Sequence, residues 1–230
     1  MLLAAAVLAA GCGAAAQQPP HRAAAPVRQL ESARTAAPPP GFRTHLVTAA
    51  GVSIALPIGW QVLAQRDASG FGVLQILTKL DRSFTMPVAE LSSPDSPLKL
   101  FAFDRSFLAG RPTTIQVVQA TYRRPGGYNS WAPRMAAALR HAPGLDGAVA
   151  VAGVQLPAGL ALRGTYRTRS HDTVVAYLVP GPTGLWALLL RTPTPRARRD
   201  SGLLARAAAS FRAFRPVGGP YGPAPAPPGA

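Results

Sequence analysis

Residues 173–191 read TVVAYLVPGPTGLWALLLR, and this stretch decides how the chain folds. Two apolar runs, Thr173–Val179 and Leu185–Arg191, flank the turn residues Pro180–Gly184. Short runs joined by a turn that contains proline and glycine predict a β-hairpin. In each run both alternating sets of side chains are apolar, whereas a strand with one side in water alternates apolar with polar residues. The sequence therefore predicts a hairpin that is buried on both faces and covered on each side.

Other strands and helices are predicted from alternation and from helical spacing. Strands are expected at Thr44–Ala49, Gly51–Pro57, Leu98–Asp104, Thr113–Ala120, Ala148–Leu156 and Leu160–Arg169. Helices are expected at Tyr128–Ala142 and Pro195–Arg215, and Gly72–Glu90 carries two helical stripes. Short turns between sequential strands favour antiparallel pairing. The predicted fold class is therefore α+β, a mainly antiparallel sheet with helices covering both faces.

Composition sets the limits of the folded domain. Of the 230 residues 48% are apolar, and 24 Lys+Arg against 9 Asp+Glu give a net charge of +15. This apolar content supports a hydrophobic core and excludes disorder of the whole chain. Proline-rich composition predicts a disordered linker over residues 12–41 and a disordered tail over 217–230. The folded domain is expected at 42–216.

The N-terminus has the pattern of an export signal. Residues 2–16 read LLAAAVLAAGCGAAA, an apolar run that is too short to cross a bilayer. A short apolar segment followed by small residues is typical of a secretory signal peptide. The chain's single cysteine excludes an intramolecular disulfide, and it ends this run in Leu8-Ala9-Ala10-Gly11-Cys12.

That pentapeptide resembles the bacterial lipobox, whose cysteine thiol receives a diacylglyceryl group before cleavage. The resemblance implies a signal peptide over residues 1–11 and a lipidated Cys12 with fatty acyl chains such as palmitate. Ala9 stands where a lipobox usually has leucine. No basic residue precedes the apolar run, so a true start codon upstream of Met1 stays open as an alternative. The alternative is an ordinary signal peptide cut after residues 14–16. Either reading predicts export.

Three short marks occur in order along the domain: Leu56-Pro57-x-Gly59-Trp60, then Gly184-Leu185-Trp186, then Ala209-Ser210-Phe211 in the closing helix. In this order they resemble the PsbP-like α/β/α sandwich, in particular the LpqN-type lipoproteins of mycobacteria and other actinobacteria. The resemblance covers about Gly51 to Phe214. It implies a cell-envelope lipoprotein on the extracytoplasmic face of the cell membrane. It implies a binding or assembly role, and it offers no catalytic residues to carry over.

Residues typical of catalysis or metal binding are sparse. His21, His45, His141 and His171 lack metal-ligand spacing to one another or to a carboxylate, and a single cysteine cannot build a zinc cage. No Gly-x-Ser-x-Gly motif and no phosphate-binding glycine loop is present. Half of the eight acids of the domain adjoin an arginine, which keeps a carboxylate ionised and unsuited to act as a general acid. We expect no metal, no cofactor and no enzymatic activity.

Two basic features are candidates for binding an anion or an acidic partner. Alternation places Arg163, Arg167 and Arg169 on one face of the strand at 160–169. A loop before Trp131 interleaves cations with aromatics and holds Tyr122, Arg123, Arg124 and Tyr128. Such groups suit phospholipid headgroups, phosphorylated glycans or an acidic protein. The alternative is an ordinary solvated basic surface. Export argues against nucleic acid as the partner.

The sequence thus predicts a non-enzymatic, membrane-anchored envelope lipoprotein that binds a lipid, a glycan or a protein. One alternative is a secreted envelope hydrolase, for which His171, Asp172 and a serine would have to meet in one pocket. Another alternative is a chaperone-like adaptor for exported proteins, which would expose a contiguous apolar groove.

Overall fold

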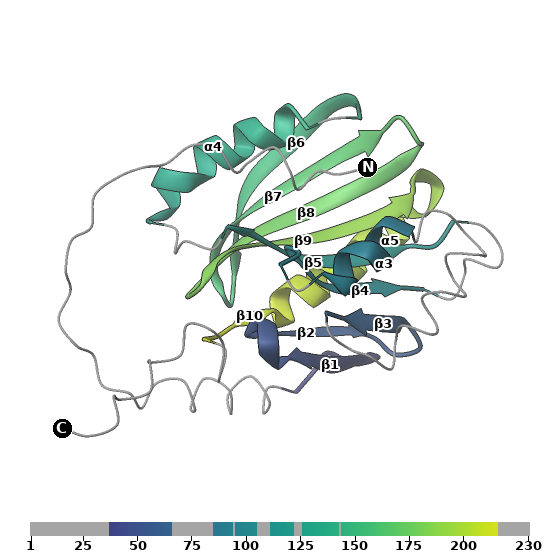
Figure 1. The fold of residues 1–230 in the computed structure, drawn as a ribbon. Coiled ribbons are helices and arrows are strands. Elements are labelled where there is room, and N and C mark those ends of the chain that lie inside the picture. Colours follow the sequence, from purple (N-terminus) through teal and green to yellow (C-terminus); the bar gives the residue numbers. More distant parts are fainter. Residues whose placement is uncertain are drawn as a thin grey trace, which may run out of the picture.

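The computed structural model describes residues 37–65, 85–93, 95–104, 111–121, 126–142 and 144–215. In these residues the strands form two sheets, one seven-stranded and one three-stranded (Figure 1). Every pairing between neighbouring strands is antiparallel. The prediction of a mixed α/β fold with mainly antiparallel sheet is therefore confirmed.

The large sheet has the order β3-β4-β5-β9-β8-β7-β6. Its strands are β3 (Gln61–Ala64), β4 (Leu98–Phe103), β5 (Thr114–Thr121), β6 (Leu145–Leu156), β7 (Gly159–Thr168), β8 (Asp172–Gly181) and β9 (Gly184–Pro193). The small sheet has the order β1-β2-β10. Its strands are β1 (Phe42–Val47), β2 (Val52–Pro57) and β10 (Arg212–Ala213). The helices are α3 (Thr85–Ser92), α4 (Tyr128–Arg140) and α5 (Ala197–Ser210), with 3-10 turns at Thr48–Ala50 and Thr194–Arg196.

Several predicted segments lie outside the described residues: the signal peptide over 1–11, the linker up to residue 36, the first helical stripe after Gly72, and the tail over 217–230. The described end of the second stripe is helix α3. No helix in the described residues is long and apolar enough to span a membrane.

The predicted hairpin is strands β8 and β9, and it is buried on both faces. Residues 172–179 of β8 and 184–188 of β9 are all buried. The two strands pair in a continuous register, in which Tyr177 lies opposite Leu188 and Val179 opposite Trp186. Their side chains divide between two hydrophobic clusters, one on each face of the large sheet.

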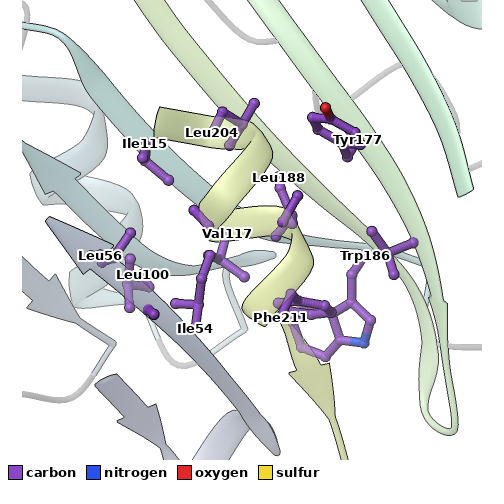
Figure 2. Packing of buried hydrophobic residues seen from close by; sticks show 14 of the residues in the cluster. Ile54, Leu56, Leu100, Ile115, Val117, Tyr177, Trp186, Leu188, Leu204 and Phe211 are labelled. Atoms are coloured by element: carbon purple, nitrogen blue, oxygen red, sulfur yellow. The ribbon is translucent and has the colours of Figure 1, made fainter. Parts of the chain in front are cut away.

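Helix α5 and the small sheet pack on the face that we call the α5 face. Figure 2 shows Leu204 of α5, and Phe211 directly after the helix, in one buried cluster with Ile54 of β2 and Leu188 of β9. The Ser210 hydroxyl accepts a hydrogen bond of 2.8 Å from the Ala55 backbone N–H. This bond joins the end of α5 to the edge of β2.

Helix α4 packs on the opposite face, which we call the α4 face. The chain leaves β5 in the middle of the large sheet and enters β6 at its edge, and α4 is the connection between them (Figure 1). A Cβ on Gly164 of β7 would lie 2.9 Å from Leu139 Cδ1, and one on Gly153 of β6 would lie 2.8 Å from the Tyr128 hydroxyl oxygen. The two glycines therefore allow α4 to approach the sheet closely.

Three details differ from the predictions. The closing helix ends at Ser210 rather than Arg215, because the chain becomes extended at Phe211 and β10 pairs with β2. The predicted single sheet is two sheets, since β2 pairs with β1 and β10 and not with any strand of the large sheet. The four-residue strand β3 was not predicted, because its alternation is too short to stand out from a turn.

A matched pair of glycine substitutions tests the approach of α4. We expect Gly164→Ala to lower the free energy of unfolding by about 1–3 kcal/mol, because the new methyl group would push Leu139 out of place. Gly202→Ala in α5 meets open space and should raise the same free energy by about 0.5–1 kcal/mol, through helix propensity. Urea denaturation followed by circular dichroism measures both. A Gly164→Ala protein as stable as the wild type would contradict the close packing.

Candidate functional site

The β6–β7 hairpin forms one end of the large sheet, and α4 covers only one of its faces. Helix α5 packs against β2, β8 and β9, nearer the centre of the sheet. We call the side chains of β6 and β7 that point away from α4 the open face. The open face comprises Asp146, Ala150, Ala152, Val154, Arg163, Thr165 and Arg167, with Asp146 directly opposite Arg167, and it continues into the buried Leu156 and Ala161. Asp146, Ala150, Ala152 and Arg167 are exposed, and Val154, Arg163 and Thr165 are half-buried.

Arg163 lies in the middle of the open face. It stands opposite Ala152 in β6 and opposite Tyr177 in β8, and its guanidinium carbon lies 6.0 Å from the centre of the Tyr177 ring. The Arg163 Nε is buried and has no hydrogen-bond partner among the described residues. A guanidinium carries five N–H donors in a planar fork that matches a carboxylate or a phosphate. This half-buried cation can therefore bind an anion through two hydrogen bonds at once.

The structure brings together only some of the predicted candidates. Arg163 and Arg167 share the open face, as the alternation predicts. Tyr128 lies on the α4 face, where its ring packs edge-on against Trp131 with centroids 5.2 Å apart. Arg169 lies in the turn after the last residue of β7, exposed to solvent, and its backbone N–H donates to the Gly144 carbonyl. Cys12, Tyr122, Arg123 and Arg124 lie outside the described residues.

Other arginines surround buried carboxylates and have structural roles. Asp172 begins β8, and its side chain is 3% exposed. It accepts hydrogen bonds from Arg191 Nε at 2.6 Å, from Ser170 Oγ at 3.2 Å and from Arg111 Nη1 at 3.3 Å. The alternation of β8 places this cluster on the α4 face. Three donors to one carboxylate compensate its removal from water.

Asp200 forms a second cluster on the α5 face. Its side chain is 1% exposed. Thr113 Oγ1 donates to Oδ2 at 2.6 Å, Thr192 Oγ1 donates to the same oxygen at 2.7 Å, and Arg199 Nε donates to Oδ1 at 2.7 Å. Burial raises the pKa of the Asp200 carboxyl, but these three donors outweigh burial and hold its pKa below the usual value. The cluster joins the first turn of α5 to β5 and β9.

Sequence reasoning identified only part of these clusters. The adjacent Arg199 and Asp200 do form an ion pair. Asp104 pairs with Arg196, which lies 92 positions further along the chain, at 3.2 Å. The partners of Asp172 lie 19 and 61 positions away. Such pairs depend on strand register, so no local motif could have revealed them.

Ser170, His171 and Asp172 do not have the arrangement of a catalytic triad. Ser170 Oγ donates directly to Asp172, whereas a triad places the histidine between the serine and the aspartate. His171 has a positive φ of 58° and is exposed in the turn before β8. Within the described residues no three His, Cys, Asp or Glu side chains gather as a metal site would require.

Exposed large apolar side chains in the described part of the chain are Ile58 and Leu160. Ile58 lies in the turn between β2 and β3, and Leu160 is the second residue of β7. Ile58 therefore lies in a connection between the two sheets, whereas Leu160 lies in a strand of the large sheet.

Comparison with known proteins finds similar solved structures but no matching family. No family model matches the chain, and no curated protein matches it. The solution structure of the cyanobacterial PsbP protein (CyanoP) from a Synechocystis species is similar to it at a TM-score of 0.45 and 13% identity. The similarity covers 78% of this chain and 96% of that protein. A structural similarity this weak gives no information about function.

The Asp200 cluster predicts a dependence of stability on pH. The pKa of Asp200 is lower in the folded than in the unfolded protein, so its contribution to stability is complete at neutral pH. That contribution is lost as the pH falls below about 3.9, the usual value for aspartate, and through the folded pKa. We expect Asp200→Ala to lower the free energy of unfolding at pH 7 by about 1–3 kcal/mol and to flatten its loss in acid.

Asp95→Ala is the matched control, because Asp95 is exposed in the turn before β4. It should leave both the stability at pH 7 and the acid profile unchanged. Denaturant titrations between pH 2.5 and 7 compare the three proteins. An Asp200→Ala protein with the wild-type acid profile would contradict the role of the cluster.

Proposed function

We propose that this chain is a non-enzymatic lipoprotein of the bacterial cell envelope whose domain binds an anionic partner through the open face. Arg163 carries the proposal, because its buried Nε lacks a partner among the described residues, while Arg111, Arg191 and Arg199 pair with buried aspartates and Arg196 with the half-buried Asp104. Holding an arginine half-buried without an acid costs stability. A bound phosphate or carboxylate would offset that cost.

The anchor and the location belong to the same proposal and rest on the sequence. The apolar run that ends at Cys12 supports export and lipidation, which would place the domain on the extracytoplasmic face of the cell membrane. The order of the three marks from Leu56 to Phe211 supports a PsbP-like sandwich of the LpqN type, with helices covering both faces, in an actinobacterial protein. A basic face tethered near anionic lipids would lie close to its ligand.

Two further activities stay alternatives without a specific observation in their favour. A secreted hydrolase would need an arrangement other than that of Ser170, His171 and Asp172. A chaperone-like adaptor would need an apolar groove on the domain.

Lipidation is tested by the substitution Cys12→Ala. We expect the full chain, produced in a bacterium that processes lipoproteins, to partition into the detergent phase of a Triton X-114 extract. The Cys12→Ala protein should move to the aqueous phase, because the acyl chains need the thiol. Arg163→Gln is the control and should partition like the wild type. Equal partitioning of the Cys12→Ala protein and the wild type would refute the anchor.

Anion binding is tested on the Cys12→Ala chain, so that no acyl chain contributes to vesicle binding. We expect it to bind vesicles of phosphatidylglycerol and phosphatidylcholine more tightly than vesicles of phosphatidylcholine alone. Arg163→Gln and Arg167→Gln should each weaken this binding about fivefold at 0.1 M salt, the effect of about 1 kcal/mol per cation at an anionic surface. Cosedimentation measures the affinity.

The matched control is Arg198→Gln, which removes an exposed charge from α5. It tests whether net charge alone explains the binding, and it should weaken binding less than either open-face substitution. Equal losses for Arg163, Arg167 and Arg198 would show that binding has no preferred face and would count against the proposal. Charge reversal at Arg123 and Arg124 applies the same assay to the predicted basic loop.

A further inference from the structure

The outer strands of the two sheets differ in how they are protected against pairing with another chain. An unprotected edge offers unpaired N–H and C=O groups, and proteins shorten such strands or place charges or proline on them. Strand β10 has two residues and β3 has four. Strand β1 has six residues and includes Arg43 and His45. These three edges each show a protective feature.

Strand β6 shows little protection. It is the last strand of the large sheet and runs for twelve residues, Leu145–Leu156, with the sequence LDGAVAVAGVQL. From Gly147 onward it has no charged residue and no proline. Its exposed residues are Asp146, Gly147, Ala148, Ala150, Ala152, Gly153 and Gln155. A register shift lies between Asp146 and Ala150, so the regular ladder covers residues 150–156.

We propose that β6 pairs with β6 of a second copy of this chain, antiparallel, across a two-fold axis perpendicular to the sheet. With the axis at Val151, this residue would face Val151 of the other copy, and Ala150 would face Ala152 of the other copy. Like charges in that position repel, and β6 has none there. Asp146 lies at one end of the strand; with the axis at Val151 it would face Leu156 of the other copy. The two large sheets would join into one continuous sheet.

The chain's own terminal segments fit this edge less well than a second copy does. Prolines interrupt residues 13–26, 38–41 and 216–230, and the proline-free run 27–37 carries the charged residues Arg28, Glu31 and Arg34. A proline cannot donate to a ladder of backbone hydrogen bonds. The dimer uses backbone groups of β6, whereas the proposed anion site uses side chains of the open face. The two proposals therefore fail or succeed separately.

Sedimentation equilibrium of the Cys12→Ala chain at 0.15 M salt tests the dimer. We expect twice the monomer mass at tens of micromolar. The double substitution Ala150→Glu and Ala152→Glu should weaken the dimer at least tenfold, because four carboxylates would gather near the axis. The carboxylate introduced at position 152 would face Arg163 within its own chain, which supports the fold. Thermal unfolding checks that the variant is folded.

The control changes charge by the same amount elsewhere: Ala205→Glu and Ala209→Glu lie on the exposed side of α5 and should leave the dimer intact. A cysteine scan gives a second measure, since the Cys12→Ala chain has no other thiol. Single cysteines at 149–154 should form an intermolecular disulfide most readily at one position, where Cα atoms face each other about 5 Å apart. A monomeric wild type, a dimer that survives the double substitution, or uniform cross-linking would each overturn the proposal.

Discussion

Strands β8 and β9 have apolar side chains on both faces, and neither face can be left in water without a large cost in free energy. This requirement shapes the rest of the chain. After β5 the chain crosses the large sheet as α4 and returns at the far edge as β6. After β9 it crosses the opposite face as α5 and ends beside β2 as β10. Two crossings on opposite faces bury both sides of the central hairpin.

Two buried aspartates lie where these apolar strands end. Asp172 on the α4 face and Asp200 on the α5 face lie at the same end of strands β5, β8 and β9. The adjacent residues Arg191 and Thr192 of β9 point to opposite faces, and Arg191 donates to Asp172 while Thr192 donates to Asp200. Each carboxylate is inaccessible to water and satisfied by several donors, so burial is compensated. Part of the arginine surplus therefore neutralises acids within the fold, whereas Arg163 and Arg167 form no ion pair with an acid in the described residues.

Much of the fold could be predicted because its signal is local. The apolar runs around Pro180–Gly184 predicted the hairpin, and four-residue spacing predicted α4 close to its observed bounds. The separation into two sheets could not be predicted in this way. The separation depends on which strands pair with β2, and the third strand of the small sheet, β10, has only two residues. For the candidate site, alternation along β7 placed Arg163 and Arg167 together, but it could not reveal that α4 puts Tyr128 on the other face.

The open face and the bare edge of β6 have one physical origin. Helix α4 packs on β6 and β7 from one side, whereas α5, on the other side, packs on β2, β8 and β9. Small side chains suit this end, because Ala150 and Ala152 expose little apolar surface to water, whereas larger ones would need a cover. The same small residues leave Arg163 half-buried rather than buried, although its Nε is covered. A ligand on the open face would contact guanidinium groups, and a second strand at the edge would contact only backbone groups. Because the two sets of atoms do not overlap, a joined sheet of two copies would present Arg163 and Arg167 from each copy on one continuous surface, and the proposed anion site would occur twice on it.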